Sequence, residues 1–238
     1  MTSAASAQPH TWRLPPNGAH AASQRHRLLV GRQGIFRADF SLAAYEMLFR
    51  APGRVGLRID LWNSTQQDRA TEHVIATTFH RGVDLVGDLP AFINFTRGYL
   101  MSTPDLRCDP SRVVIEVVES AFADSSLRHR LADLRAEGFR VAVDDFIGTY
   151  NQLQLLHEAD YVKVDHRDLA SRGQTLVDLA SGHGAVLVAE RIETRAQLAR
   201  CIDMGFTLFQ GHAFEPAVTQ QVADDPCPPD VQPRSRLF

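Results

Sequence analysis

The 238-residue sequence lacks three features that mark other classes of protein. It has no basic excess, since 25 Lys and Arg stand against 28 Asp and Glu, which argues against a partner that is a nucleic acid polymer. It has no apolar run long enough for a signal peptide or a membrane span. We therefore expect a soluble, cytoplasmic protein with no membrane partner.

Cysteine is also scarce. Cys108, Cys201 and Cys227 stand far apart and do not have the spacing of a zinc site, so we expect reduced thiols. The ten histidines are scattered in the same way, and we do not expect them to bind metal.

With 44% hydrophobic residues, the chain can bury one core of ordinary size. Its ends, 1–26 and 217–238, are rich in small, polar and proline residues, which predicts flexible segments around one domain over 27–216. Short apolar runs inside that domain predict eight strands, namely Leu28 to Val30, Ala43 to Phe49, Ala91 to Phe95, Val113 to Val118, Val141 to Val143, Tyr161 to Val164, Val186 to Ala189 and Thr207 to Phe209.

Helical patterns lie between several of these runs. They cover Thr71 to Phe79, Leu127 to Glu137, Leu176 to Gly182 and Arg195 to Gly205. Because strand and helix alternate, the pattern predicts an α/β fold with a mainly parallel sheet. With eight such strands in one domain, a closed TIM-like (β/α)8 barrel is the favoured architecture, and an open sheet is the alternative.

Polar side chains lie within or directly after these apolar runs. They are Glu46, Asn94, Glu116, Asp144, Asp145, Lys163, Glu190 and Gln210. A single carboxylate at the end of a strand is more often a helix cap or a surface ion pair than a ligand. In a barrel, however, the carboxyl ends of parallel strands meet on one face. We therefore expect six of these side chains to share one small volume, namely Glu46, Asn94, Glu116, Asp144, Asp145 and Glu190.

Carboxylates packed so closely repel one another, and protons or bound cations relieve the repulsion. Oxygen ligands from several carboxylates and one amide suit Mg²⁺ or Mn²⁺ rather than softer metals. The pattern therefore predicts a two-metal site. Such sites promote displacement at phosphorus, with a nearby lysine, here Lys163, offsetting the charge of the phosphate.

These residues and their neighbours resemble the EAL domain family of cyclic di-GMP phosphodiesterases. The segment Tyr45–Arg50 is similar to the Glu-Ala-Leu signature of the family, with Met47 in place of the alanine. The remaining motifs follow in the family's order: Asn94 in Phe-Ile-Asn-Phe, the pair Glu116 and Glu119, Asp144-Asp145, Lys163 in Val-Lys-Val-Asp165, Glu190 to Thr194, and Gln210-Gly211. The likeness runs from about Val30 to Pro216 and is greatest to the branch often fused to an HDOD domain.

The resemblance implies a TIM-like barrel that binds cyclic di-GMP and hydrolyses it to linear pGpG with two Mg²⁺ or Mn²⁺ ions. It implies that Glu190 accepts a proton from the attacking water and that Lys163 positions this water. The metal ligands that it implies are Glu46, Asn94, Glu116, Asp144 and Asp145.

The resemblance also assigns residues around this centre. Gln33, Arg50 and Gln210 are expected to contact the substrate, although Gln33 and Arg50 could be structural. The residues expected to act by holding the ligands and loops in place are Glu119, Asp165 and Glu193. Plain ion pairs are the alternative for the first two of these.

Beyond Met47, the sequence departs from the family at two places near the proposed catalytic residues. After the two aspartates the family usually has Phe-Gly-Thr-Gly, whereas this chain has Phe146-Ile147-Gly148-Thr149. Because Ile147 does not readily take a positive φ, we expect the loop to follow another path, on which the second metal depends. Arg191 replaces a glycine beside Glu190, where it could crowd the site or bind a phosphate.

A working phosphodiesterase is the favoured function. The alternatives are a receptor that binds cyclic di-GMP without cleaving it, and an interaction module that has lost the nucleotide and binds a protein regulator. A homodimer is a further partner that the resemblance leaves open.

Overall fold

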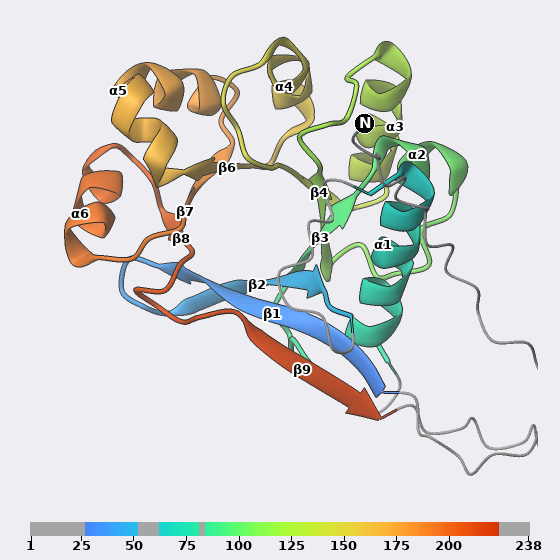
Figure 1. Cartoon of the computed structure of the whole chain (residues 1–238). Coiled ribbons are helices and arrows are strands. Elements are labelled where there is room, and N and C mark those ends of the chain that lie inside the picture. The colour runs from blue at the N-terminus through green and yellow to red at the C-terminus, as the bar shows by residue number, and fades with distance from the viewer. Residues whose placement is uncertain (1–26, 52–61, 81–83, 224–238) are drawn as a thin grey trace, which may run out of the picture.

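The computed structural model describes residues 27–51, 62–80 and 84–223 (Figure 1). The strands in these ranges are β1 (Arg27–Arg37), β2 (Leu42–Phe49), β3 (Ala91–Phe95), β4 (Val113–Val117), β5 (Arg140–Val143), β6 (Tyr161–Asp165), β7 (Val186–Glu190), β8 (Leu208–Phe209) and β9 (Val218–Ala223). The helices are α1 (Ser64–Thr78), α2 (Arg97–Ser102), α3 (Ser125–Ala136), α4 (Tyr150–Leu155), the 3₁₀ turn η2 (Leu156–Glu158), α5 (His166–Ser181) and α6 (Arg195–Asp203). Each of the eight predicted strands is present.

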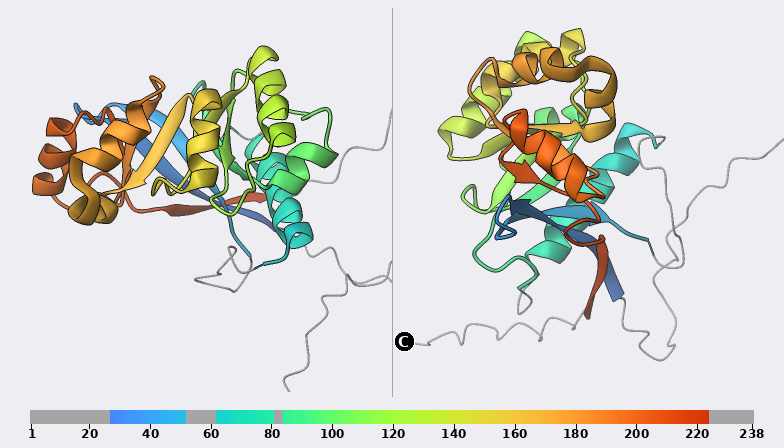
Figure 2. Two further views of the ribbon diagram at one scale, coloured as in Figure 1. Left: turned by 90° about the horizontal axis from the view of Figure 1, so that it is seen from above. Right: turned by 90° about the vertical axis from the view of Figure 1, so that its left-hand side faces the viewer.

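Strands β1 to β8 close into a barrel. Strands β2 to β8 run parallel in chain order, and β1 completes the ring by pairing antiparallel with both β2 and β8. Figures 1 and 2 show the helices on the outside of this ring. The predicted TIM-like barrel is confirmed, with one reversed strand. The reversal follows from the short turn between β1 and β2, because so short a connection can join only antiparallel strands.

Two of the helices were not predicted from the sequence. Helices α2 and α4 have six residues each, so neither shows enough turns for an apolar stripe to be recognised. Each begins at a threonine that caps it, Thr96 for α2 and Thr149 for α4. None of the helices in the described ranges combines the length and the apolar character needed to span a bilayer.

The interior of the barrel has an apolar floor. Its side chains are Ile35, Ala44, Phe92, Val114, Ala142, Tyr161, Val188 and Leu208, one from each of the eight strands. Side chains alternate between the two faces of a strand, so the residue two positions along also faces the interior. A second and larger apolar cluster packs the outside of the barrel wall against the helices.

The residues two positions beyond the apolar floor are all polar, and we call them the polar layer. They are Gln33, Glu46, Asn94, Glu116, Asp144, Lys163, Glu190 and Gln210. In β1 the step runs backwards along the chain, because that strand is reversed. Because side chains alternate along each strand, one polar side chain from each strand or its end lies at the same level, directly above the apolar floor.

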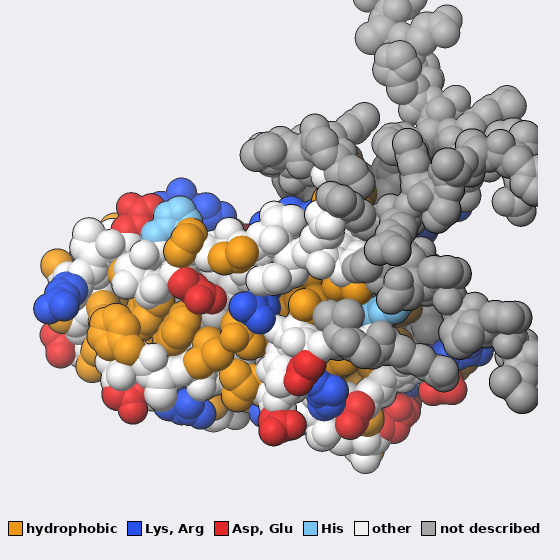
Figure 3. All heavy atoms as spheres, turned by 90° about the horizontal axis from the view of Figure 1, so that it is seen from below, with side chains coloured by type: hydrophobic (Ala, Val, Ile, Leu, Met, Phe, Trp, Pro, Cys, Tyr) orange, Lys and Arg blue, Asp and Glu red, His pale blue; other side chains and the backbone are white. Residues whose placement is uncertain are grey.

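Aromatic contacts tie the turn between β1 and β2 to the segment after β8. The ring of Phe214 lies 5.1 Å from that of Phe36 and 4.8 Å from that of Phe40. Figure 3 shows apolar side chains gathered on the underside of the molecule as drawn in Figure 1, the side on which β1 and β9 run. These ring contacts support the antiparallel closure of the barrel.

Strand β9 lies in the segment 217–238 that was predicted to be a flexible tail. It pairs antiparallel with β1 from Arg32↔Val218 to Arg27↔Ala223, so residues 218–223 are a strand and not part of a tail. The strand has no continuous apolar run, because Thr219, Gln220 and Gln221 separate Val218 from Val222, and this hid it in the sequence. Residues 1–26 and 224–238, including Cys227, lie outside the described residues, whereas Cys108 and Cys201 are free thiols as expected.

We expect Val222→Ala to lower the free energy of unfolding by about 2 kcal/mol, because it leaves a cavity in the core. Val222 is 2% exposed and packs in the large apolar cluster. Val218 on the same strand is 45% exposed, so Val218→Ala is the matched control, with an expected loss below about 0.5 kcal/mol. Urea unfolding measures both, and equal losses would show that β9 contributes no buried contact.

Candidate active site in the polar layer

Lys163 is the only lysine in the sequence, and it is buried at the centre of the polar layer with 1% of its side chain exposed. Its Nζ lies 2.5 Å from Glu116 Oε1, 2.8 Å from Glu190 Oε1, 3.1 Å from Asp144 Oδ1 and 3.5 Å from Glu46 Oε1. These carboxylates come from β4, β7, the end of β5 and β2. One ammonium group therefore holds together side chains from four other parts of the barrel.

The charges of this cluster perturb one another. Burial acts to lower the pKa of Lys163, but the carboxylates around it outweigh burial and hold that pKa well above its usual value. Burial raises the pKa of Glu190 to about 8, although Lys163 acts in the opposite direction. Burial also raises the pKa of Glu116 well above its usual value. The repulsion expected from the sequence is thus relieved by the lysine and by proton uptake.

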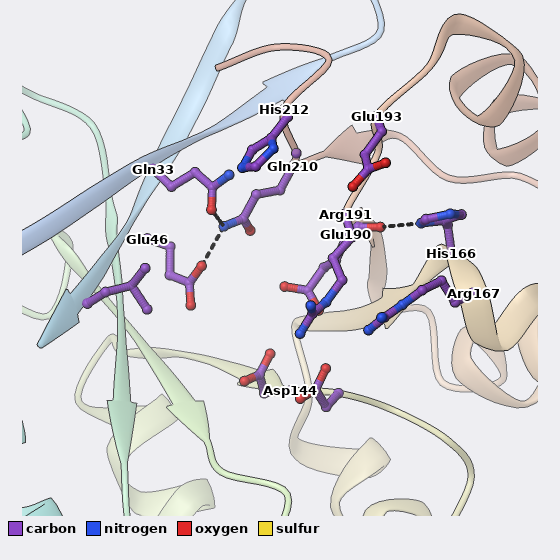
Figure 4. Close-up of a pocket in the computed structure, with 13 residues that line it drawn as sticks. Gln33, Glu46, Asp144, His166, Arg167, Glu190, Arg191, Glu193, Gln210 and His212 are labelled. Carbon is purple, nitrogen blue, oxygen red and sulfur yellow. Dashed lines mark hydrogen bonds between the residues drawn. The ribbon is translucent and has the colours of Figure 1, made fainter. Parts of the chain in front are cut away.

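Glu46 is held by the side chain of Gln210, which also binds Gln33. Glu46 lies opposite Gln33 in the pairing of β1 with β2. The Nε2 group of Gln210 donates to Glu46 Oε2 and, over 3.0 Å, to Gln33 Oε1 (Figure 4). Gln210 therefore holds Glu46, and Gln33 accepts a second hydrogen bond from the same amide. Both glutamines, which were predicted to contact a substrate, line the cavity described below.

The loop after β5 carries Asp144 and Asp145. It is held by the buried side-chain amide of Gln152, a role that was not predicted. The Oε1 atom of Gln152 accepts hydrogen bonds from the N–H groups of Ile147 at 3.0 Å and Thr149 at 3.1 Å. Its Nε2 donates to the backbone carbonyls of Asp145 at 2.8 Å and Asp144 at 3.3 Å. Thr149 and Gln152 also form a capping box at the start of α4, a spacing visible in the sequence.

The backbone of this loop shows where its positive φ angles fall. Positive φ angles occur at Asp145, at 42°, and at Gly148, at 73°, but not at Ile147. The turn that needs glycine thus falls on Gly148. Desolvation in the cleft and the charge of Asp144 raise the pKa of Asp145 to about 6.

Asp165, at the end of β6, binds two arginines. Its carboxylate accepts a forked pair of hydrogen bonds from Arg167, with Nε at 3.0 Å from Oδ1 and Nη2 at 2.5 Å from Oδ2. The Nε atom of Arg191 lies 2.9 Å from the same Oδ2. Although burial acts to raise the pKa of Asp165, the hydrogen bonds from Arg167 hold it below its usual value. A role for Arg167 at this site was not predicted. Its position two residues after Asp165 was the feature of the sequence that could have indicated it.

Two cavities open above the polar layer. The first, of about 480 Å³, is lined by Glu46, Asp144, Glu190, Arg167 and Gln210 among others. The second, of about 570 Å³, is lined by residues that include Arg50, Asn94 and Glu119. Leu48, Asp145 and Arg191 line both cavities, so the two adjoin along these side chains.

The other predicted residues lie around these cavities. The guanidinium of Arg50 donates to the carbonyl of Phe49 at 2.9 Å and lies against Gly31, where a Cβ atom would come within 2.6 Å of Arg50 Cζ. Glu119 and Glu193 are exposed and line the second and first cavities respectively. Within the described residues neither carboxylate forms an ion pair or hydrogen bond, so no contact there supports a bracing role for them.

The oxygen atoms of the cluster suit a hard cation. The carboxylates of Glu46, Glu116 and Asp144 each place an oxygen within 3.5 Å of one point, the Nζ atom of Lys163. Glu116 Oε2 is buried without a hydrogen-bond partner. In the part of the chain that the structure describes, no three Asp, Glu, His or Cys side chains are already arranged as a ligand set, and Lys163 stands where the oxygens converge. The oxygen donors of these carboxylates are of the chemical type that hard cations such as Mg²⁺ bind.

Comparison with known proteins gives one family and several relatives. A profile of the EAL domain family matches residues 90–217. The uncharacterized protein YuxH of Bacillus subtilis is 28% identical over 201 residues, which cover 81% of this chain and 48% of YuxH. The cyclic di-GMP phosphodiesterase CdgJ of Vibrio cholerae is 27% identical over 220 residues, which cover 88% of this chain and 49% of CdgJ. The chain thus spans about half the length of these relatives.

Solved structures share the fold. The manganese and cyclic di-GMP complex of Klebsiella pneumoniae BlrP1 superposes with a TM-score of 0.65 at 24% identity, over 86% of this chain and 59% of that one. The Bacillus subtilis protein YkuI, which has an EAL domain and was solved with cyclic di-GMP and calcium, gives a TM-score of 0.65 at 24% identity. That match covers 80% of this chain and 56% of YkuI. At this identity the likeness establishes the barrel.

We expect Lys163→Met to lower the free energy of unfolding by about 3–5 kcal/mol at pH 8 in a chelator, because it removes the cation from buried carboxylates. The loss should shrink toward pH 5. A carboxyl group with a raised pKa in the folded protein lowers stability at a pH where it is ionised in the unfolded chain. Near pH 5 fewer carboxyl groups of the unfolded chain are ionised, so this cost is smaller. Urea unfolding of the single variant and of the double variant with Glu116→Gln measures this. The double variant should recover part of the loss, and an unchanged stability of the single variant would contradict the role of Lys163.

We expect Gln152→Leu to raise the hydrogen-exchange rates of the Ile147 and Thr149 amides at least about tenfold, because both lose their acceptor. Gln154 on the same helix makes no side-chain hydrogen bond to described residues, so Gln154→Leu is the matched control. Exchange measured by NMR that is equally slow in both variants would show that another group holds the loop.

Proposed function

The chain belongs to the EAL domain family, whose profile matches more than half of it, and on that premise we propose that it is a metal-dependent phosphodiesterase that hydrolyses cyclic di-GMP to linear pGpG. The observation that carries the proposal is the polar layer. Lys163 and four carboxylates converge there beneath two adjoining cavities. Relatives named as cyclic di-GMP phosphodiesterases, such as CdgJ, support the choice of substrate.

Divalent cations, Mg²⁺ or Mn²⁺, would neutralise charge on the phosphate and polarise it. The residues that would hold one of them are Glu46, Asn94, Glu116 and Asp144, and those for the other are Asp144 and Asp145. The buried Oε2 atom of Glu116, which has no partner, supports a ligand role for that side chain. Lys163 would then give up part of its contact with these carboxylates and face the phosphate.

Glu190 is the proposed proton acceptor. Its carboxylate lies at the end of β7, lines the first cavity and is held 2.8 Å from Lys163 Nζ. Burial raises its pKa to about 8, and its carboxylate form is the one that can accept a proton. Glu190 would take a proton from the attacking water as the new P–O bond forms. The bond from phosphorus to the ribose oxygen breaks, that oxygen takes up a proton from solvent water, and Glu190 later returns its proton to the solvent.

A receptor that binds cyclic di-GMP without cleaving it is the second candidate. One observation favours it: Lys163 occupies the point where the carboxylates converge, and each of its four partners lies within 3.5 Å. If the lysine keeps all four contacts, fewer carboxylate oxygens are free to bind cations, while both cavities remain open to a nucleotide.

We expect the protein to release pGpG from cyclic di-GMP in Mg²⁺ or Mn²⁺ and to stop in a chelator. Glu190→Gln should lower kcat by about 10²- to 10⁴-fold, because it removes the proton acceptor, and should leave the affinity for cyclic di-GMP unchanged. Chromatography of the products and isothermal titration measure the two quantities.

Two control variants accompany this assay. Glu46→Ala should abolish product, because it removes a proposed ligand, whereas Glu137→Gln makes the same change as Glu190→Gln at an exposed site and should alter nothing. Binding without product in the unsubstituted protein would select the receptor. If the protein neither binds cyclic di-GMP nor forms product, the interaction module would be the remaining function. Full turnover by Glu190→Gln would remove that residue from the mechanism.

A further inference from the structure

We propose that Arg191, with Arg167 beside it, forms a phosphate-binding site at the mouth of the barrel, where the two cavities meet. The identity of the ligand rests on the proposed function. The site would hold the phosphodiester of cyclic di-GMP that is not being cleaved.

The backbone at Arg191 is the first observation. Its φ angle is 55°, in the left-handed region that glycine adopts without strain and arginine does not. The next residue cannot move to relieve the strain. Ile192 donates to the carbonyl of Gln210 at 3.0 Å and accepts from the N–H of Ala213 at 2.9 Å, and its backbone packs against Gly211. An arginine at a position that favours glycine indicates a use for its side chain.

The donors of Arg191 are the second observation. Arginine has five N–H donors in a planar fork. Only Nε is engaged, by Asp165 at 2.9 Å, and within the described residues the two terminal nitrogens have no partner. The side chain is 59% exposed, so a ligand can reach it. A guanidinium anchored through Nε and open at its terminal nitrogens is arranged to bind a phosphate with two parallel hydrogen bonds.

The balance of charge is the third observation. Arg167 and Arg191 both contact Oδ2 of Asp165, so two positive groups share one carboxylate and leave positive charge at this place. The polar layer below carries four carboxylates around a single ammonium and repels anions. An anionic dinucleotide therefore needs cations on its approach, and this pair supplies them.

The position of the pair indicates which phosphate it binds. Asp165 lies two residues beyond Lys163 on β6, one level above the polar layer and nearer the mouth. Figure 4 shows Arg167 and Arg191 side by side on the wall of the pocket that also carries Glu190. Arg191 lines both cavities, so a ligand with one nucleoside in each would pass a phosphate across it. The other phosphodiester can then lie below, against Glu190.

The test uses two substitutions at one position. Arg191→Gly and Arg191→Gln should each weaken the binding of cyclic di-GMP about 10- to 100-fold, because both remove the charged donors. Arg191→Gly should also raise the melting temperature by a few degrees, since it relieves the left-handed strain, whereas Arg191→Gln should not. Isothermal titration in a chelator, which keeps the ligand intact, and calorimetric melting give these values.

The controls separate the anion site from general effects of charge. Arg167→Gln should weaken binding, and Arg200→Gln, at an exposed position on α6 away from both cavities, should not. Inorganic pyrophosphate serves as a second probe, because it tests the anion site without the nucleosides.

The outcomes distinguish this proposal from the proposed function. Tight binding of cyclic di-GMP that survives in both Arg191 variants would overturn the phosphate site and leave the function standing. Lower melting temperatures with unchanged affinity would do the same and make Arg191 a structural residue. Loss of pyrophosphate binding in the Arg191 variants would support the site even where cyclic di-GMP fails to bind the unsubstituted protein and the proposed function falls. A protein that binds neither probe would refute both.

Discussion

The contact between one buried ammonium and four carboxylates is the interaction on which this barrel depends. Its members come from β2, β4, β6, β7 and the end of β5, so the contact can form only when the ring has closed. The apolar floor beneath it keeps water away from one side, which strengthens every charge interaction above. A cluster of this kind contributes little net stability, because each charge loses its hydration when it is buried. Its value lies in holding reactive groups in one place.

Much of this arrangement could be predicted because it follows from a local rule. Alternation along a strand places Asn94 two residues from Phe92 and Glu116 two residues from Val114, and such pairs are visible in the sequence. The central place of Lys163 was not predicted, since the expected role of this residue was to offset the charge of the phosphate. Which of several groups an ammonium contacts depends on side-chain conformations across the barrel, and a sequence does not encode these locally.

The features that could not be predicted also depend on contacts between distant parts of the chain. Strand β9 forms because β1 extends past the ring and offers a free edge, which is a property of the assembled sheet rather than of residues 218–223. Gln152 reaches back over several residues to hold its loop, and Arg191 meets Asp165 from another strand. The departures from the family, at Ile147 and Arg191, lie on the rim, whereas the polar layer is complete.

The solitary lysine has a chemical consequence. Every other basic side chain of this sequence is an arginine, so apart from the amino terminus the only primary amine belongs to Lys163, which is 1% exposed. Acylating reagents and enzymes that modify lysine therefore find no ε-amino group on the surface of the folded barrel. The rate at which such a reagent labels Lys163 would report how often the interior opens, and the chain carries this probe without any added label.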